Sequence, residues 1–467
     1  MSKVDFANGG IMRLIMQTAG PMLVAQVLSL LYSIVSQIYI GRIPGTGPVA
    51  LTGIGLCFPI IILITAFANL FGMGGAPLCA MERGKGNLRQ AELIQNISLT
   101  LLVVTGLLLF AGLWIFTRPL LHLLGASEES IRYALPYLRI YLFGCVPFMI
   151  ATGMTPFVTA QGFPKEGMKA VAAGAVANIL LTPLFIFVLH LGVAGAATAT
   201  VLSQILSAGI IIRFLRGKNT ELKGRLVGFA GLAANGKTIL NIAVLGSVAF
   251  IMYFASSLVN MVSNAMLSQY GGDLFIAVMT IAASVRQLLE TPALAICEGT
   301  SPIMSFNYGA RNGGRVLKAI WIMTALTVGY TALAWGVIEW KPEWFIQVFC
   351  SDEKLVQAAL PLLHIYLYAF VFQALQYSAQ LTFKALNKKG RAIFFSLFRK
   401  IIIIVPLAVL LPQYNGLGAK GVFIAEPVSN ALGGTLVFLT MLLTLVPELR
   451  RLKPDMRSKS EKIPSGT

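Results

Sequence analysis

Charged residues are scarce in this sequence, and so are the residue types that build most catalytic and metal sites. Asp, Glu, Lys and Arg make up 12% of the chain, roughly half of their share in soluble domains. The three histidines, His122, His190 and His364, are scattered, and the five cysteines show neither paired nor metal-ligand spacing. No G-x-S-x-G pattern occurs. The sequence therefore argues against an enzyme, a metal centre and a disulfide scaffold, and leaves at most a monovalent cation to be bound.

Apolar residues are correspondingly abundant. They make up 57% of the chain, and the mean hydropathy is +0.79, which predicts a polytopic membrane protein. Runs long enough to cross about 30 Å of hydrocarbon recur about twelve times. They lack the alternation of barrel strands, so we expect helices. The predicted spans are 11–39, 49–72, 92–116, 131–157, 167–189, 194–214, 238–268, 274–306, 316–338, 356–383, 392–411 and 420–445.

The positive charge is distributed unevenly between the two sides of these spans. If the N-terminus is cytoplasmic, most of the 36 Lys and Arg residues lie in cytoplasmic loops and ends. The opposite side holds only Arg42, Arg118, Arg132, Lys341, Lys354 and Lys420. By the positive-inside rule, both termini are predicted to be cytoplasmic. The net charge of +18 is explained by this topology, and nucleic acid is not an expected partner.

The chain contains two copies of one unit. The stretch 134–142, Ala-Leu-Pro-Tyr-Leu-Arg-Ile-Tyr-Leu, returns 225 positions later at 359–367 with seven of nine residues identical. Gly84 and Asn87 recur at the same spacing as Gly309 and Asn312. We therefore predict an all-α membrane protein of twelve transmembrane helices in two pseudo-symmetric six-helix lobes. The expected parts are a first lobe at 1–214, a cytoplasmic linker at 215–237, a second lobe at 238–446 and a disordered basic tail at 447–467.

Ionisable residues lie inside one predicted span of the second copy. Arg286, Glu290 and Glu298 fall within 274–306, where each costs about 2.5–3.5 kcal/mol to insert at mid-depth. Such groups normally face protein or water, so they are candidates for coupling transport to a cation. The first copy has no carboxylate near a membrane midplane. Alternatively, Arg286 and Glu290 form a permanent structural pair, one helical turn apart.

Further candidates come from neighbouring polar residues. Asn260, Asn264 and Ser284 are assigned to the same coupling site, and Glu426 beside Pro427 is a weaker third carboxylate candidate. A polar stripe in the first span either lines a wet cavity or holds helices together. Asn178 and Thr182 precede Pro183, which frees backbone carbonyls or only kinks the helix. The expected substrate cavity comprises Gln26, Tyr32, Ser33, Ser36, Asn178, Thr182, Gln373, Gln376, Tyr377 and Gln380.

Four stretches resemble the multidrug and toxic compound extrusion (MATE) transporters. They read LYSIVSQIYIG at 31–41, NILLTPLFI at 178–186, GVAGAA at 192–197 and PIMSFNYGA at 302–310. The resemblance implies a V-shaped pair of lobes in a bacterial inner membrane, acting as a monomer among membrane lipids. It also implies export of small organic, often cationic, compounds against inflow of Na⁺ or H⁺, with K⁺ a further possibility and no cofactor. Rival hypotheses are a lipid-linked precursor flippase of the same superfamily and a membrane-embedded transferase.

The sequence departs from the family at several positions. The family usually has Asn and Asp where this chain has Ser33 and Ser36, and often Asp at Thr182. A first-lobe aspartate mechanism therefore does not carry over, and coupling through the span at 274–306 is inferred from this sequence alone. Unusual coupling residues point to a specialised exporter of a natural product, of which the precolibactin exporter is an example.

Overall fold

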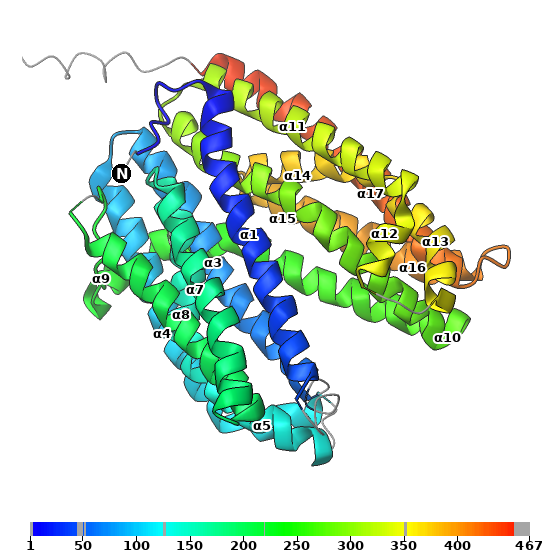
Figure 1. Cartoon of the computed structure of the whole chain (residues 1–467). Helices are drawn as coiled ribbons and strands as arrows, with labels where there is room; N and C mark the ends of the chain where they lie inside the picture. The colour runs from blue at the N-terminus through cyan, green and yellow to red at the C-terminus, as the bar shows by residue number, and fades with distance from the viewer. Residues whose placement is uncertain are drawn as a thin grey trace, which may run out of the picture. The chain divides into compact units, whose positions relative to one another are not determined.

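The computed structural model describes residues 3–43, 50, 53–124, 128–218, 220–349 and 353–452 (Figure 1). Helices are the only regular elements within these ranges. Ten of them are long and apolar enough to span a membrane, and two bent pairs of helices supply up to two more spans. The predicted all-α membrane fold is confirmed in this part of the chain, and its ten to twelve candidate spans are compatible with the twelve predicted. It follows from the length of the apolar runs, because a helix satisfies its own backbone groups in lipid.

The elements follow one another in chain order with short connections. They are α1 (Ile11–Gly41), α3 (Phe58–Gly84), α4 (Leu88–Leu123), α5 (Glu128–Phe143), α6 (Cys145–Ala160), α7 (Pro164–Pro183), α8 (Gly192–Arg216), α9 (Phe229–Ala234), α10 (Gly236–Gly309), α11 (Gly313–Trp340), α12 (Pro342–Gln347), α13 (Glu353–Leu367), α14 (Phe370–Ala385), α15 (Lys389–Leu397), α16 (Val405–Leu410) and α17 (Ala419–Arg451). π-Helical turns at Leu184–Val188 and Phe398–Ile404 extend α7 and α15. A left-handed residue, Gly272 with φ 69°, divides α10 into two spans.

The fourth and tenth spans are bent, which the sequence did not predict. The chain turns by 57° between α5 and α6 and by 46° between α13 and α14. The repeated nonapeptide ends directly before each bend. At the first bend a Cβ on Gly144 would lie 2.0 Å from Oε1 of Gln204 on α8, so glycine permits this approach. The duplication thus preserves a break in the helix as well as a sequence.

Backbone conformations repeat at the same spacing as the sequence. Asn87 caps α4 by accepting from the backbone N–H of Gln90, and Asn312 caps α11 by accepting from that of Arg315. Residues with positive φ also recur 225 or 226 positions apart, in the pairs Gly86 and Arg311, Gly162 and Asn387, His190 and Asn415, and Gly192 and Gly418. A left-handed backbone conformation costs more free energy for a residue with a Cβ than for glycine. Their retention by Arg, Asn and His shows that the two copies share one backbone plan.

The chain separates into two compact units. Unit 1 comprises Met1–Asp5, Pro21–Arg83 and Asn87–Phe250, and unit 2 comprises Phe6–Gly20, Gly84–Gly86 and Ile251–Thr467. The linker predicted at 215–237 is part of unit 1. Helix α17 continues through residues 447–451, which the sequence analysis assigned to the tail, because Leu449 is buried there. Residues 453–467 of the predicted tail and Cys350 lie outside the described residues. The other four cysteines are buried and unpaired.

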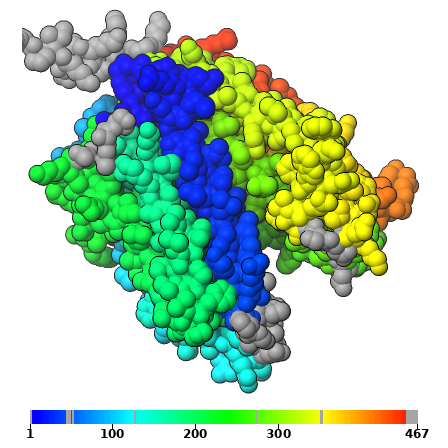
Figure 2. All heavy atoms as spheres, viewed as in Figure 1, coloured from blue at the N-terminus to red at the C-terminus, as the bar shows by residue number. Residues whose placement is uncertain are grey.

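Large apolar side chains lie on the surface of the spans. On α1, Met16 is 59% exposed and Leu31 is 48% exposed, and Figure 2 shows this helix in blue on the surface of the viewed face. Soluble proteins rarely expose apolar residues along a whole helix. These side chains are expected to contact lipid.

Residues 220–222, which follow α8, are fixed within unit 1 by hydrogen bonds. Thr220 donates to Oε1 of Gln161 at 2.6 Å, and Gln161 donates to Oε1 of Gln95 at 2.7 Å. Gln95 in turn donates to the carbonyl of Leu222 at 3.1 Å. These amides are buried, so the linker is an ordered part of the lobe.

A carboxylate adds a second attachment of this segment. Burial opposes ionisation of Glu221, but hydrogen bonds from Lys3 and Arg83 outweigh it and lower the pKa of the Glu221 carboxyl. Arg83 Nη2 lies 2.7 Å from Glu221 Oε2. The linker, the N-terminal segment and the end of α3 therefore meet at one ionised carboxylate.

Candidate functional site

Four charged side chains meet inside unit 2. Arg286 and Glu290 lie one turn apart on α10, and Nε of Arg286 donates to Oε1 of Glu290. Nη1 of Arg286 also pairs with Oε1 of Glu426 on α17. That oxygen accepts a second bond, of 3.0 Å, from Nη1 of Arg399, which also donates to Oδ1 of Asn430 at 2.5 Å. The four charged side chains are between 5% and 18% exposed. Two guanidinium groups thus share one carboxylate oxygen, and the four charges sum to zero.

Helix α14 places neutral polar groups beside Glu290. Nε2 of Gln373 donates to Oε1 of Glu290 at 2.6 Å and to the hydroxyl of Tyr377 at 2.5 Å. The Oε1 atoms of Gln373 and Gln376 are buried and have no hydrogen-bond partner among the described residues. One turn further on, Gln380 donates to Ser396. A carboxylate and an unsatisfied amide oxygen are therefore neighbours, which is a donor set suited to a hard cation.

A fifth charge lies next to this group. Lys400, on the π-helical turn after α15, donates to the hydroxyl of Ser256 on α10. Arg286 donates to the hydroxyl of Tyr366 at 3.2 Å, and its guanidinium carbon lies 5.5 Å from the centre of that ring. With Lys400 protonated, the cluster would hold three positive charges and two carboxylates, so a metal cation would be accommodated best where a guanidinium gives up a carboxylate.

The other predicted coupling residues lie apart from this cluster. Glu298 is partly buried, within electrostatic reach of Lys384 and Tyr253. Asn260 and Asn264 are exposed on α10. Ser284 donates to the carbonyl of Thr280 in its own helix, at 2.8 Å.

Sequence reasoning gave Glu426 a minor role and did not assign Arg399 or Lys400 to the site. The sequence did indicate the two bases, because Arg399 and Lys400 interrupt the apolar run at 392–411. What the sequence could not supply was the partner, since Arg399 and Glu426 lie on different helices.

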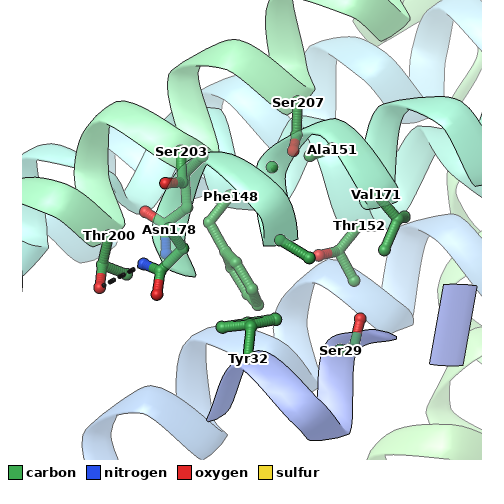
Figure 3. A pocket seen from close by; sticks show the side chains of 13 residues that line it. Ser29, Tyr32, Phe148, Ala151, Thr152, Val171, Asn178, Thr200, Ser203 and Ser207 are labelled. Atoms are coloured by element: carbon green, nitrogen blue, oxygen red, sulfur yellow. Dashed lines mark hydrogen bonds between the residues drawn. The ribbon is translucent and has the colours of Figure 1, made fainter. Parts of the chain in front are cut away.

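A cavity of about 140 Å³ lies within unit 1 (Figure 3). Its lining comes from four spans and carries no charged residue: Ser29, Tyr32, Phe148, Ala151, Thr152, Val171, Gly174, Ala175, Asn178, Thr200, Ser203, Gln204 and Ser207. Nδ2 of Asn178 on α7 donates to Thr200 on α8 at 3.2 Å. Thr182, one turn along α7, donates to Oδ1 of Asn178 at 3.3 Å. The cavity thus combines aromatic rings with a hydrogen-bonded neutral wall.

The structure brings only some predicted cavity residues to this wall. Tyr32 and Asn178 line it, and Thr182 supports it through Asn178. Gln26, Ser33 and Ser36 are half-buried on α1 and do not line it. The prediction missed the contribution of α8, although Thr200, Ser203 and Ser207 have the spacing of one helix face. Of the predicted cavity residues in unit 2, Gln373 and Tyr377 belong to the charge cluster, and Gln376 and Gln380 are buried nearby on α14.

Comparison with known proteins identifies the family. The MatE family model matches residues 21–184 and 232–410, which is most of the chain and includes both halves. The chain belongs to the MatE family. The Multidrug export protein MepA of Staphylococcus haemolyticus is 26% identical over 436 residues, covering 93% of this chain and 94% of that protein. MepA of Staphylococcus saprophyticus is 24% identical over 441 residues, covering 93% and 95%.

Solved structures of MatE-type transporters share the fold. One is an outward-facing conformation of a multidrug resistance MATE family transporter of the MOP superfamily, with a TM-score of 0.89, 22% identity, and coverage of 97% of this chain and 99% of that one. A MOP superfamily transporter from Pyrococcus furiosus, described as having a binding pocket of reverse polarity, has a TM-score of 0.88, 21% identity, and coverage of 97% and 100%. This MatE chain is a multi-pass membrane transporter of small molecules and not an enzyme.

Proposed function

We propose that this chain exports small organic compounds, amphipathic or cationic ones, across a bacterial cytoplasmic membrane in exchange for Na⁺, K⁺ or a proton. The observation that carries the proposal is the family match in both halves, together with relatives named multidrug export proteins that align over nearly their whole length. In this proposal the chain works as a monomer among membrane lipids, with both termini in the cytoplasm.

The cavity of unit 1 supports a neutral or cationic substrate. Its lining has hydroxyl and amide groups but no charged side chain. In Figure 3 the rings of Tyr32 and Phe148 point into the same space, and such rings attract organic cations. A volume of about 140 Å³ is below the roughly 300 Å³ of a drug-sized pocket. The cavity would therefore hold one ring or one alkylammonium group of a larger substrate.

The charge cluster of unit 2 supports the exchange for a cation. When a cation binds Glu290, Arg286 must leave that carboxylate, and a lone buried guanidinium would be strongly unfavourable. Here Arg286 keeps its bond to Glu426, so its charge stays paired. Nε2 of Gln373 now faces Glu290, and rotation of this amide would turn its unsatisfied Oε1 toward the cation as a second oxygen ligand. Glu298 is the alternative carboxylate, with Lys384 as its nearby base.

Two finer hypotheses have less support. A flippase for lipid-linked precursors would need a cationic cavity, yet the unit 1 cavity is neutral and Arg139 instead lies over the ring of Trp114, 5.8 Å from its centre. Export of a natural product, precolibactin included, stays a prediction drawn from the unusual residues at Ser33, Ser36 and Thr182.

Transport by purified protein in liposomes tests the proposal. Ethidium, a planar organic cation, should accumulate on one side of the membrane when an opposing Na⁺, K⁺ or H⁺ gradient is imposed. One of the three gradients should drive it, and an ionophore that collapses that gradient should stop it. Protein-free liposomes are the control. Ethidium movement that is the same with and without every gradient would contradict the antiport mechanism.

A further inference from the structure

An apolar groove opens beside the last turn of α8 in unit 1. One part is a cavity of about 140 Å³ whose apolar wall includes Leu99 and Val103 on α4 and Ile212 on α8. It shares Arg216, Gly224 and Leu226 with a more open hollow that Lys223 and Arg225 complete. One continuous groove therefore has an apolar end and a basic end.

The basic end is fixed by the backbone. The N–H of Gly224 donates to the carbonyl of Leu215 at 2.9 Å, and the N–H of Arg225 donates to Oδ1 of Asn96 at 2.9 Å. The N–H of Val227 donates to Thr100 at 2.8 Å. Leu222 and Gly224 are buried, whereas Lys223 and Arg225 are exposed, as alternation in an extended segment dictates. The segment therefore holds its basic side chains outward in a defined place.

The three bases have no side-chain partner within the described part of the chain. The side chains of Arg216, Lys223 and Arg225 form no ion pair or hydrogen bond with any residue that the structure describes. Large apolar side chains lie next to them in sequence: Leu226 is 60% exposed and Phe229, at the start of α9, is 88% exposed. Figure 1 shows α9 at the periphery of unit 1. Unpaired bases beside exposed apolar residues are typical of a segment that lies at a membrane surface.

The depth of the groove matches the boundary between headgroups and hydrocarbon. Arg216 is the last residue of α8, whose 25 residues span about 37 Å, slightly more than the roughly 30 Å hydrocarbon layer. Helix α4 has 36 residues, about 54 Å, so about 12 Å extends beyond the hydrocarbon at each end. Leu99 lies about 16 Å from the start of α4. If both helices are centred in the bilayer and run along its normal, the basic end lies at headgroup depth and the apolar end just inside the hydrocarbon.

We propose that this groove is a binding site for an anionic phospholipid. The lipid phosphate would be held by Arg216, Lys223 and Arg225, and the first part of an acyl chain would fill the cavity beside Leu99, Val103 and Ile212. A zwitterionic lipid would leave the three positive charges only partly compensated, and a free phosphate would leave the apolar cavity empty. The groove shares no lining residue with the neutral cavity or with the charge cluster, so the proposal does not depend on the identity of the transported compound.

Native mass spectrometry of the purified full chain tests the site. The protein is titrated with dioleoyl phosphatidylglycerol or with dioleoyl phosphatidylcholine, which has the same chains and a zwitterionic headgroup. The wild type should retain the anionic lipid preferentially. Replacing Arg216, Lys223 and Arg225 together by Gln should weaken that binding on the order of a hundredfold, because each base near an anionic surface contributes a factor of about five. The fold should survive, since these side chains are exposed and unpaired.

Two matched variants separate charge from shape. Replacing Arg89, Lys165 and Lys237 by Gln removes the same charge from exposed positions of unit 1 that do not line the groove and should leave lipid binding unchanged. Val103→Phe, which fills the apolar cavity, should weaken phosphatidylglycerol binding although every base is retained. Equal retention of the two lipids by the wild type, or full binding by the groove variant, would overturn the proposal. Displacement of the lipid by millimolar inorganic phosphate would show an anion site instead.

Discussion

Replacing Glu426 by Gln is expected to lower the melting temperature of the purified protein sharply. The Oε1 atom of Glu426 accepts from both Arg286 and Arg399, and its side chain is 8% exposed. The neutral amide leaves two buried guanidinium groups with only Glu290 as a carboxylate. Removing one partner of a buried ion pair destabilises a protein by about 3–5 kcal/mol. Thermal unfolding in detergent, followed by loss of the monodisperse peak in gel filtration, measures the effect.

Charge balance can be restored to check the cause. Arg399→Gln combined with Glu426→Gln removes one charge of each sign. The double variant should therefore be more stable than either single variant. Glu448→Gln is the matched control, because it lies on the same helix, α17, and pairs with Lys388 at the surface. Glu448 is 35% exposed, so the loss there should be below about 1 kcal/mol. Equal melting temperatures for Glu426→Gln and Glu448→Gln would contradict a tightly paired cluster.

Adding a side chain at Gly246 is expected to be the second large effect. In unit 1, α3 and α10 cross with their backbones in contact: a Cβ on Gly246 would lie 1.7 Å from the carbonyl oxygen of Leu70. A Cβ on Gly74 would lie 2.2 Å from the carbonyl oxygen of Ile242 and 2.9 Å from Cα of Gly246. The atoms in the way belong to backbone, so the helices must move apart. Small residues permit such close crossings in membranes.

A graded series measures this crossing. Gly246→Ala should lose about 1–3 kcal/mol, the usual penalty of overpacking, and Gly246→Val should lose more. Gly112→Ala is the control, because Gly112 lies inside α4 with no neighbouring atom within 4 Å of an added Cβ. That change should be neutral or slightly stabilising, since alanine favours a helix over glycine. If Gly246→Ala melts at the same temperature as Gly112→Ala, the close crossing is not a feature of the folded protein.

The fold was largely predictable, because membrane insertion and duplication leave clear marks in sequence. Run length predicted the spans, and the 225-residue spacing predicted two copies of one unit, in which Asn87 and Asn312 cap equivalent helices. The bends after α5 and α13 were not predicted, because the apolar run continues through them. The apolar character of a segment shows that it can lie in a lipid bilayer, but it does not show where the helix axis bends.

The site was predictable only where its geometry is local. The pairing of Arg286 with Glu290 follows from their four-residue spacing on one helix. The sharing of Glu426 by two arginines depends on how α10, α17 and the turn after α15 pack, which no spacing reveals. The same reason explains Ser33 and Ser36: helical period assigns residues to one face but does not identify the helix that covers that face. Polar stripes therefore identify candidate helices better than candidate ligands.

Gradient-driven transport by two single-residue variants tests the central claim that a carboxylate of unit 2 couples export to a cation. Glu290→Gln and Glu298→Gln would be reconstituted separately into liposomes and assayed for ethidium accumulation under the gradient that drives the wild type. We expect Glu290→Gln to equilibrate ethidium without accumulating it, because the neutral amide cannot exchange Arg286 for a cation. Full accumulation by both variants, with the same dependence on the gradient as the wild type, would contradict coupling through these carboxylates of unit 2.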